Sequence, residues 1–157
     1  MKPIDFIELD KNKANKIVSS LQQLLADYQI FYTNMRGFHW NVKGSSFFTL
    51  HAKFEEMYDD AAEKVDEIAE RILQLGGTPA SKFSDYLKLS HIKEIDGVSA
   101  AAEIVKHILD TFKHLIAEER EIVSLAGDAE DETTVAMMDD FLVYQEKLVW
   151  MLAAYLS

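Results

Sequence analysis

The side chains best suited to chemistry lie on one stripe of a helix expected over residues 45–75. One histidine and five carboxylates follow one another at steps of four, four, four, three and four: His51, Glu55, Asp59, Glu63, Asp66 and Glu70. Residues three and four apart share a helix face, so the six side chains point the same way. Like charges at this spacing repel by roughly 0.2–0.5 kcal/mol per pair, which a bound cation would relieve. The alternative is an ordinary solvated acidic face.

The neighbouring row of the same helix has a different pattern. Asp60, Lys64 and Glu67 alternate in sign, as side chains on an exposed helix face usually do. No lysine or arginine interrupts the first stripe. The contrast favours metal binding over simple solvation for the acidic stripe.

A second histidine, His39, lies with Trp40 at the end of a helix expected over residues 11–38. Taken alone, the histidine would be a cap or a packed residue, and the tryptophan would belong to the core. Together with His51, Asp66 and Glu70, however, His39 completes a set of two imidazoles and two carboxylates. Such mixed nitrogen and oxygen donors suit ferrous iron, and also zinc or manganese.

The spacing of these residues requires two chains for one metal site. His51 and Asp66 are 15 positions apart, which is roughly 22 Å along a helix axis. Two copies of the helix packed antiparallel about a two-fold axis near Tyr58 would place His51 of one beside Asp66 of the other. Asp66 and Glu70 are one turn apart and could chelate together. We therefore expect a homo-oligomer with shared sites.

Several other kinds of protein are excluded by what the sequence lacks. None of the five histidines follows a glutamate by three positions, so the di-iron motif of a single bundle is absent. The zinc-protease motif His-Glu-x-x-His is also absent, as is cysteine. No apolar run reaches the roughly 20 residues of a membrane span. We expect a cytoplasmic protein, with the nucleoid as an alternative location.

The remaining pattern predicts an all-α fold with one domain over residues 1–157. Helices are expected over residues 11–38, 45–75, 97–126 and 132–156. Their predicted starts and ends are Ser45 or Ser46, Asp96 and Asp131 as N-caps, with Gly76, Gly77, Pro79 and Gly127 as terminators. A linker over residues 77–95, with a short helix over 83–89, is long enough to cross the bundle. This is the connectivity of a ferritin-like four-helix bundle.

The ordered motifs resemble the Dps family, the DNA-protection-during-starvation proteins or mini-ferritins. They are Phe38-His39-Trp40-Asn41-Val42-Lys43-Gly44, Phe47, Leu50-His51, Phe54-Glu55-Glu56-Met57-Tyr58, Asp66-Glu67-Ile68-Ala69-Glu70-Arg71, Gly76-Gly77-Thr78-Pro79 and Glu146-Lys147-Leu148-Val149-Trp150-Met151-Leu152. The resemblance spans essentially the whole chain. It implies hollow dodecamers that oxidise ferrous iron, preferring hydrogen peroxide to oxygen in many members, and that store the ferric mineral.

The resemblance also assigns roles to individual residues. It implies that His39 and His51 of one subunit bind iron with Asp66 and Glu70 of its partner, close to Trp40. Glu55 and Glu56 match positions where the family nucleates mineral.

Other acidic residues and the overall charge suggest how the shell would meet iron and DNA. Asp139, Asp140 and Glu146 are candidate pore residues, although a solvated face explains them as well. The net charge of −11 disfavours DNA binding, because an acidic surface repels phosphates. Two alternatives stay open: a structural DNA-binding cage with incidental metal sites, and a zinc- or manganese-loaded cage without redox activity.

Overall fold

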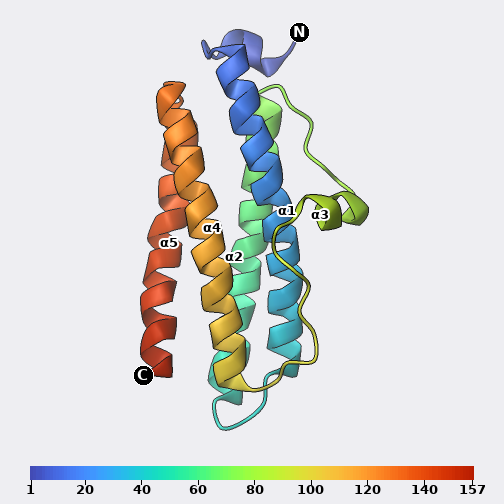
Figure 1. Ribbon diagram of the computed structural model, residues 1–157, viewed down its shortest axis with the longest axis vertical. Coiled ribbons are helices and arrows are strands. Elements are labelled where there is room, and N and C mark those ends of the chain that lie inside the picture. Colours follow the sequence, from blue (N-terminus) through green and yellow to red (C-terminus); the bar gives the residue numbers. More distant parts are fainter.

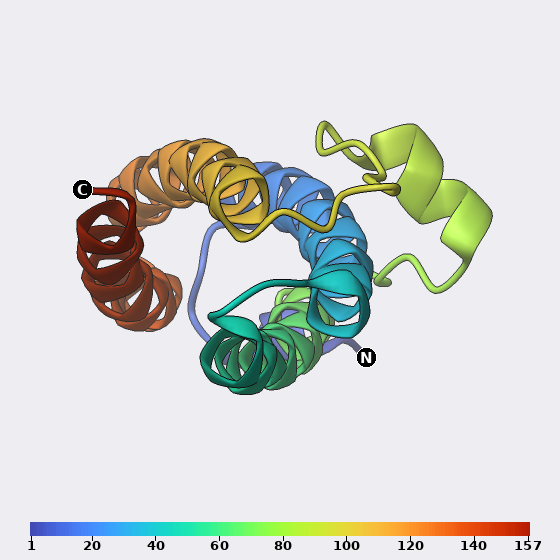
Figure 2. The same cartoon turned by 90° about the horizontal axis from the view of Figure 1, so that it is seen from below.

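Four long helices run side by side along the length of the molecule (Figure 1). The computed structural model describes residues 1–157, and its elements are η1 (Pro3–Phe6), α1 (Lys11–Asn41), α2 (Phe47–Gln74), α3 (Phe83–Leu89), α4 (Ala101–Asp128) and α5 (Glu132–Leu156). Short connections make α1 and α2, and likewise α4 and α5, antiparallel neighbours. The long crossover carries α3 along the outside of α1 (Figure 2). The predicted ferritin-like all-α fold is confirmed.

Apolar side chains from all four long helices meet along the axis of the bundle. The fully buried positions include Ile17, Leu21, Leu24, Phe54, Ile68, Ile108, Leu115 and Met138. Burying each such side chain contributes about 1.5–3 kcal/mol, so this core holds the helices at fixed distances. None of the helices has an apolar stretch of the length needed to cross a membrane.

Polar side chains of α1 fasten the crossover to the bundle. Gln22 donates to the carbonyl of Thr78 at 2.6 Å and accepts from the backbone N–H of Ala80 at 3.0 Å. Asn34 donates to the Lys93 carbonyl at 2.9 Å and accepts from the Ile95 N–H at 3.0 Å. These bonds satisfy backbone groups that a segment without regular structure would otherwise leave unpaired.

The start of α4 differs from the prediction. The helix begins at Ala101, not at residue 97, and Ala100 rather than Asp96 occupies the N-cap position. Lys43 in the α1–α2 connection donates its N–H to the Ser99 carbonyl at 3.0 Å and forms an isolated parallel bridge with Ala100. This pairing keeps residues 99 and 100 extended, which delays the helix.

Other helix ends agree with the sequence in part. Asp131 caps α5 as predicted, accepting from the Thr134 N–H at 3.0 Å. Ser46 occupies the N-cap position of α2, but its hydroxyl makes no cap hydrogen bond. Helix α1 continues past residue 38 to Asn41, and α4 passes through Gly127 to Asp128. The prediction that Gly127 terminates α4 is therefore wrong.

Candidate metal centre

Two histidines face each other where α1 ends and α2 begins. His39 Nδ1 lies 2.6 Å from the His51 carbonyl oxygen, and His51 Nδ1 lies 2.8 Å from the His39 carbonyl oxygen. The two rings stack with centroids 3.7 Å apart and an interplanar angle of 16°. A carbonyl oxygen can only accept, so each Nδ1 must carry the proton. Each Nε2 is then left with a free lone pair, the form in which histidine binds a metal.

Aromatic side chains enclose this histidine pair on the side of the bundle. His39 is 7% exposed, and the Tyr58 ring meets it edge-on with centroids 5.2 Å apart. The Phe47 ring stacks on His51 at 5.0 Å. The packing fixes both imidazoles before any metal arrives, which lowers the entropy lost on binding.

The acidic stripe of α2 is exposed along its whole length. Its carboxylates are Glu55, Asp59, Glu63, Asp66 and Glu70, and none forms an ion pair within the chain. In the neighbouring row, by contrast, Lys64 and Asp60 form an ion pair at 2.5 Å. The difference between the two rows that the sequence predicted is therefore present in the structure. No lysine or arginine of the chain therefore neutralises the stripe.

One chain alone does not bring the predicted ligands together. His51, Asp66 and Glu70 lie on a single uninterrupted helix, so His51 and Asp66 are separated by roughly 22 Å along its axis. The one group of three or more potential metal ligands with mutually close atoms involves other residues. The histidine pair therefore lacks carboxylate ligands from its own subunit.

Trp40 lies on the surface beside this pair. Its side chain is 62% exposed, so the expectation that a tryptophan here would belong to the core is wrong. The Arg36 guanidinium lies 4.9 Å from the Trp40 ring, 5.7 Å from the Tyr32 ring and 5.6 Å from the Tyr58 ring. This cation–π group was not predicted, although Tyr32, Arg36 and Trp40 follow one another at helical spacing.

The remaining predicted residues are exposed, and some of them have partners. Glu56 forms an ion pair with Lys53, whereas Glu55 accepts only a hydrogen bond from the Tyr58 hydroxyl at 3.3 Å. Glu146 forms an ion pair with Arg120 on the adjacent helix. Asp139 and Asp140 are exposed without an ion pair.

A four-helix bundle with one long crossover, a preformed histidine pair and a free carboxylate stripe defines a protein of the ferritin-like class. Residues 18–157 match the ferritin-like domain family. The DNA protection during starvation protein of Porphyromonas gingivalis is 50% identical over 154 residues, covering 98% of this chain and 97% of that protein. The corresponding protein of Brevibacillus brevis is 40% identical over 137 residues, or 87% of this chain and 92% of that protein.

Solved structures give the same assignment. The Dps protein of Vibrio cholerae, described as a member of the ferritin-like diiron-carboxylate superfamily, superposes with a TM-score of 0.94 at 47% identity, covering 97% of this chain and 96% of that chain. A Dps protein of Bacillus brevis reaches a TM-score of 0.90 at 38% identity, covering 93% of this chain and 98% of that one. The chain belongs to the Dps family.

Proposed function

We propose that this protein oxidises ferrous iron at sites shared between two subunits and stores the ferric product inside a hollow dodecamer. The observation that supports the shared site is the histidine pair. Both Nε2 atoms are free and fixed in place, yet no carboxylate of the same chain joins them. In the proposed site, Asp66 and Glu70 of the partner subunit supply the missing oxygen ligands.

The substrates are ferrous ions and hydrogen peroxide, with oxygen as the alternative oxidant. Two ferrous ions give up one electron each to one peroxide molecule, which takes up two protons and leaves as two waters. Carboxylate ligands favour the ferric ion because electrostatic attraction grows with the charge of the cation. Consuming iron and peroxide together limits oxidative stress. This chemistry, rather than a coat on DNA, is the protection that we propose.

The rest of the stripe would receive the product. Asp59 and Glu63 have no ion-pair partner, and Glu55 has none either. Ferric ions that leave the site would meet these carboxylates first, with Glu55 and Glu56 as the proposed nucleation positions. Asp139 and Asp140 are the better pore candidates, because Arg120 already neutralises Glu146.

The surface of the single chain supports assembly. Trp150 is 66% exposed and Val143 71% exposed on α5, and Phe48 is 84% exposed at the start of α2. Large apolar side chains with this much exposure are available for contact with other subunits. Their exposure fits a subunit that is buried against its neighbours.

The decisive experiment mixes two half-site variants. One carries His39→Ala and His51→Ala, and the other carries Asp66→Asn and Glu70→Gln. Each alone should lose most peroxide-dependent iron oxidation, because every site lacks half its ligands. When equal amounts are refolded together, half of the two-fold pairs are mixed, and each mixed pair has one intact site. About a quarter of wild-type activity should therefore return under random pairing.

Two control measurements are needed to interpret this experiment. Light scattering must show that parents and mixture form particles far larger than the 17.9 kDa chain. Tagged subunits must show that mixed assemblies formed. Mixed assemblies as inactive as their parents would disprove the shared site.

If wild-type protein binds zinc or manganese but consumes no peroxide when iron is supplied, the protein is a metal cage without redox activity.

A further inference from the structure

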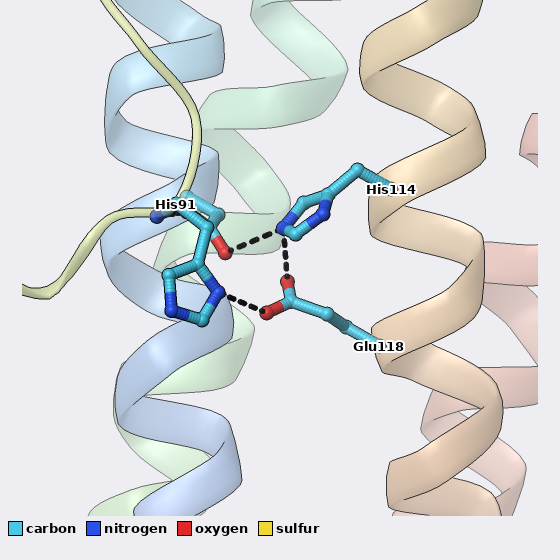
Figure 3. Close-up of side chains that lie close together, drawn as sticks. His91, His114 and Glu118 are labelled. Atoms are coloured by element: carbon cyan, nitrogen blue, oxygen red, sulfur yellow. Dashed lines mark hydrogen bonds and ion pairs between the residues drawn. The ribbon is translucent and has the colours of Figure 1, made fainter.

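A second cluster of potential metal ligands lies on the crossover side of the bundle. Asp27 of α1, His91 of the crossover and His114 and Glu118 of α4 each offer one atom, and all four atoms lie within 4.8 Å of one another. Figure 3 shows both imidazoles beside the Glu118 carboxylate. The cluster has no signal in the sequence because three separate segments supply it. Of the four residues, only His114 and Glu118 could be recognised as neighbours from sequence, because they lie four positions apart on one helix.

The spacing of these atoms is close to what a metal ion requires. His114 Nε2 lies 3.3 Å from Asp27 Oδ2 and 3.5 Å from Glu118 Oε2, and His91 Nδ1 lies 3.8 Å from Glu118 Oε1. Metal–ligand bonds of 2.0–2.2 Å in a tetrahedron place neighbouring ligand atoms about 3.4 Å apart. Small side-chain movements would therefore bring the four atoms to bonding distance.

No lysine or arginine forms an ion pair with either carboxylate of the cluster. Asp27 is fully buried and the Glu118 side chain is 15% exposed. Glu118 Oε2 is buried without a hydrogen-bond partner, since its contact with His114 has only ion-pair distance. A divalent cation bound between the four side chains would give that oxygen a partner.

The surrounding bonds orient Asp27 as a ligand. Its Oδ1 accepts from the Ser90 hydroxyl and the His91 N–H, both at 2.7 Å, and from the Ile92 N–H at 3.1 Å. This fixes the carboxylate, whose Oδ2 accepts from Gln23 Nε2 at 3.2 Å and lies toward His114. Hydrogen bonds of this kind, behind the ligand atom, are typical of metal sites.

Solvent can reach the cluster from two sides. One surface cavity of about 240 Å³ is lined by Gln23, His91, Glu118 and Glu121 among others. A second of about 240 Å³ is lined by His91, His107, Asp110 and His114 among others. His91, His114 and Glu118 therefore border cavities that open to the surface.

We propose that Asp27, His91, His114 and Glu118 bind one divalent first-row transition-metal ion within each single chain. Two imidazoles and two carboxylates suit zinc and ferrous iron. The site is separate from the histidine pair, because Asp27 precedes His39 by twelve positions, roughly 18 Å along α1. Since His91 belongs to the crossover, the ion would tie the crossover to α1 and α4.

Cobalt titration of a protein with a disabled histidine pair tests the proposal. The background carries His39→Ala and His51→Ala, and cobalt(II) is the probe because tetrahedral cobalt absorbs visible light far more strongly than hexahydrated cobalt. We expect one strongly absorbing cobalt per chain, displaced by zinc. Adding His91→Ala or His114→Ala should weaken binding by about 10-fold or more, the usual effect of losing a metal-site group.

His107→Ala is the matched control, because His107 lies two turns before His114 on α4 but outside the cluster. It should leave the cobalt spectrum and affinity unchanged. Zinc should also slow hydrogen exchange over residues 88–95 in the background protein but not in the His114→Ala variant. Absence of the tetrahedral spectrum from the folded background protein would overturn the proposal. Cobalt affinity in the His91→Ala and His114→Ala variants equal to that of the background protein would overturn it too.

Discussion

Glu119 is a carboxyl group inside the hydrophobic core. It is fully buried and accepts hydrogen bonds from the Tyr28 hydroxyl at 2.8 Å and from Gln145 Nε2 at 2.7 Å. Its second oxygen has no partner. Burial raises the pKa of Glu119 to about 7, while the hydrogen bonds from Gln145 and Tyr28 partly oppose this shift. The bundle therefore holds a proton here that the unfolded chain releases at lower pH.

The Glu119→Gln substitution should remove a pH-dependent contribution to the free energy of unfolding. Because the folded-state pKa lies near 7 and the ordinary value is 4.5, the stabilising contribution is complete below pH 4.5 and is lost as pH rises to about 7. Between pH 5 and pH 8, the free energy of unfolding of the wild type should fall by about 2 kcal/mol relative to that of the variant. Urea unfolding of both proteins at the two pH values measures this. A constant difference would show that Glu119 does not titrate in this range.

Trp40 should report iron binding at the histidine pair. It adjoins His39 and is 62% exposed. In a Trp150→Phe variant, which leaves Trp40 as the only tryptophan, ferrous iron added without oxygen should quench the fluorescence. A Trp40→Phe variant that retains Trp150 is the control and should respond much less. Unchanged Trp40 emission at saturation, with binding measured independently, would place Trp40 away from the iron.

The ligands of the proposed shared site could be inferred from sequence because helical spacing is regular. The hydrogen bonds that orient the two histidines could not be predicted in this way. Each Nδ1 meets the carbonyl of the other histidine only because residues 42–46 turn α2 back against α1. Such contacts depend on the path of a loop, which has no periodic signal. The same is true of Asp27 and His91, which lie 64 positions apart.

The ends of α2 and α4 use the same backbone motif with different residues. After α2, Gly76 takes a positive φ of 85°, and Gly77 donates to the Ile72 carbonyl at 2.9 Å. After α4, Glu130 takes a positive φ of 58°, and Asp131 donates to the Ala126 carbonyl at 2.9 Å. Glycine favours this left-handed position. Gly76 therefore predicted the end of α2 correctly. Gly127, by contrast, lies three residues before Glu130, which takes the left-handed position after α4.

Correcting this mismatch should stabilise the protein. Gly127→Ala places a better helix former inside α4, and its Cβ would meet nothing within 4 Å. Glu130→Gly relieves a left-handed conformation at an exposed residue. Each change should raise the free energy of unfolding by about 0.5–1 kcal/mol, measured by urea denaturation. Gly76→Ala should destabilise instead, because φ is positive and its Cβ would lie 3.0 Å from Ile4. Stabilisation by Gly76→Ala would contradict this account.

The crossover topology was predictable at the scale of the whole molecule because chain length limits connections. Connections of five residues between α1 and α2 and of three residues between α4 and α5 force antiparallel neighbours, whereas the segment between α2 and α4 can span the bundle. The delayed start of α4 was not predictable, because it depends on Lys43 meeting Ser99 across the end of the bundle.

Charge at this scale also sets the expected behaviour toward DNA. Each chain carries a net charge of −11, and an assembly multiplies it. We expect no retardation of duplex DNA in gels at 150 mM salt near neutral pH, because phosphate contacts require local positive charge. Lys11, one of the few N-terminal cations, is already paired with Asp5 at 2.6 Å. A submicromolar Kd with a steep salt dependence would instead support the DNA-binding cage.

Helix α1 holds the crossover through main-chain groups at both ends. Gln22 contacts the backbone of Thr78 and Ala80, and Asn34 contacts the backbone of Lys93 and Ile95. A segment recognised in this way tolerates variety in its outward side chains but not in its length, since one residue more or less would shift every carbonyl and N–H. A foreign peptide sequence of the same length could therefore replace the exposed residues 81–84 without loss of the contacts that hold the crossover.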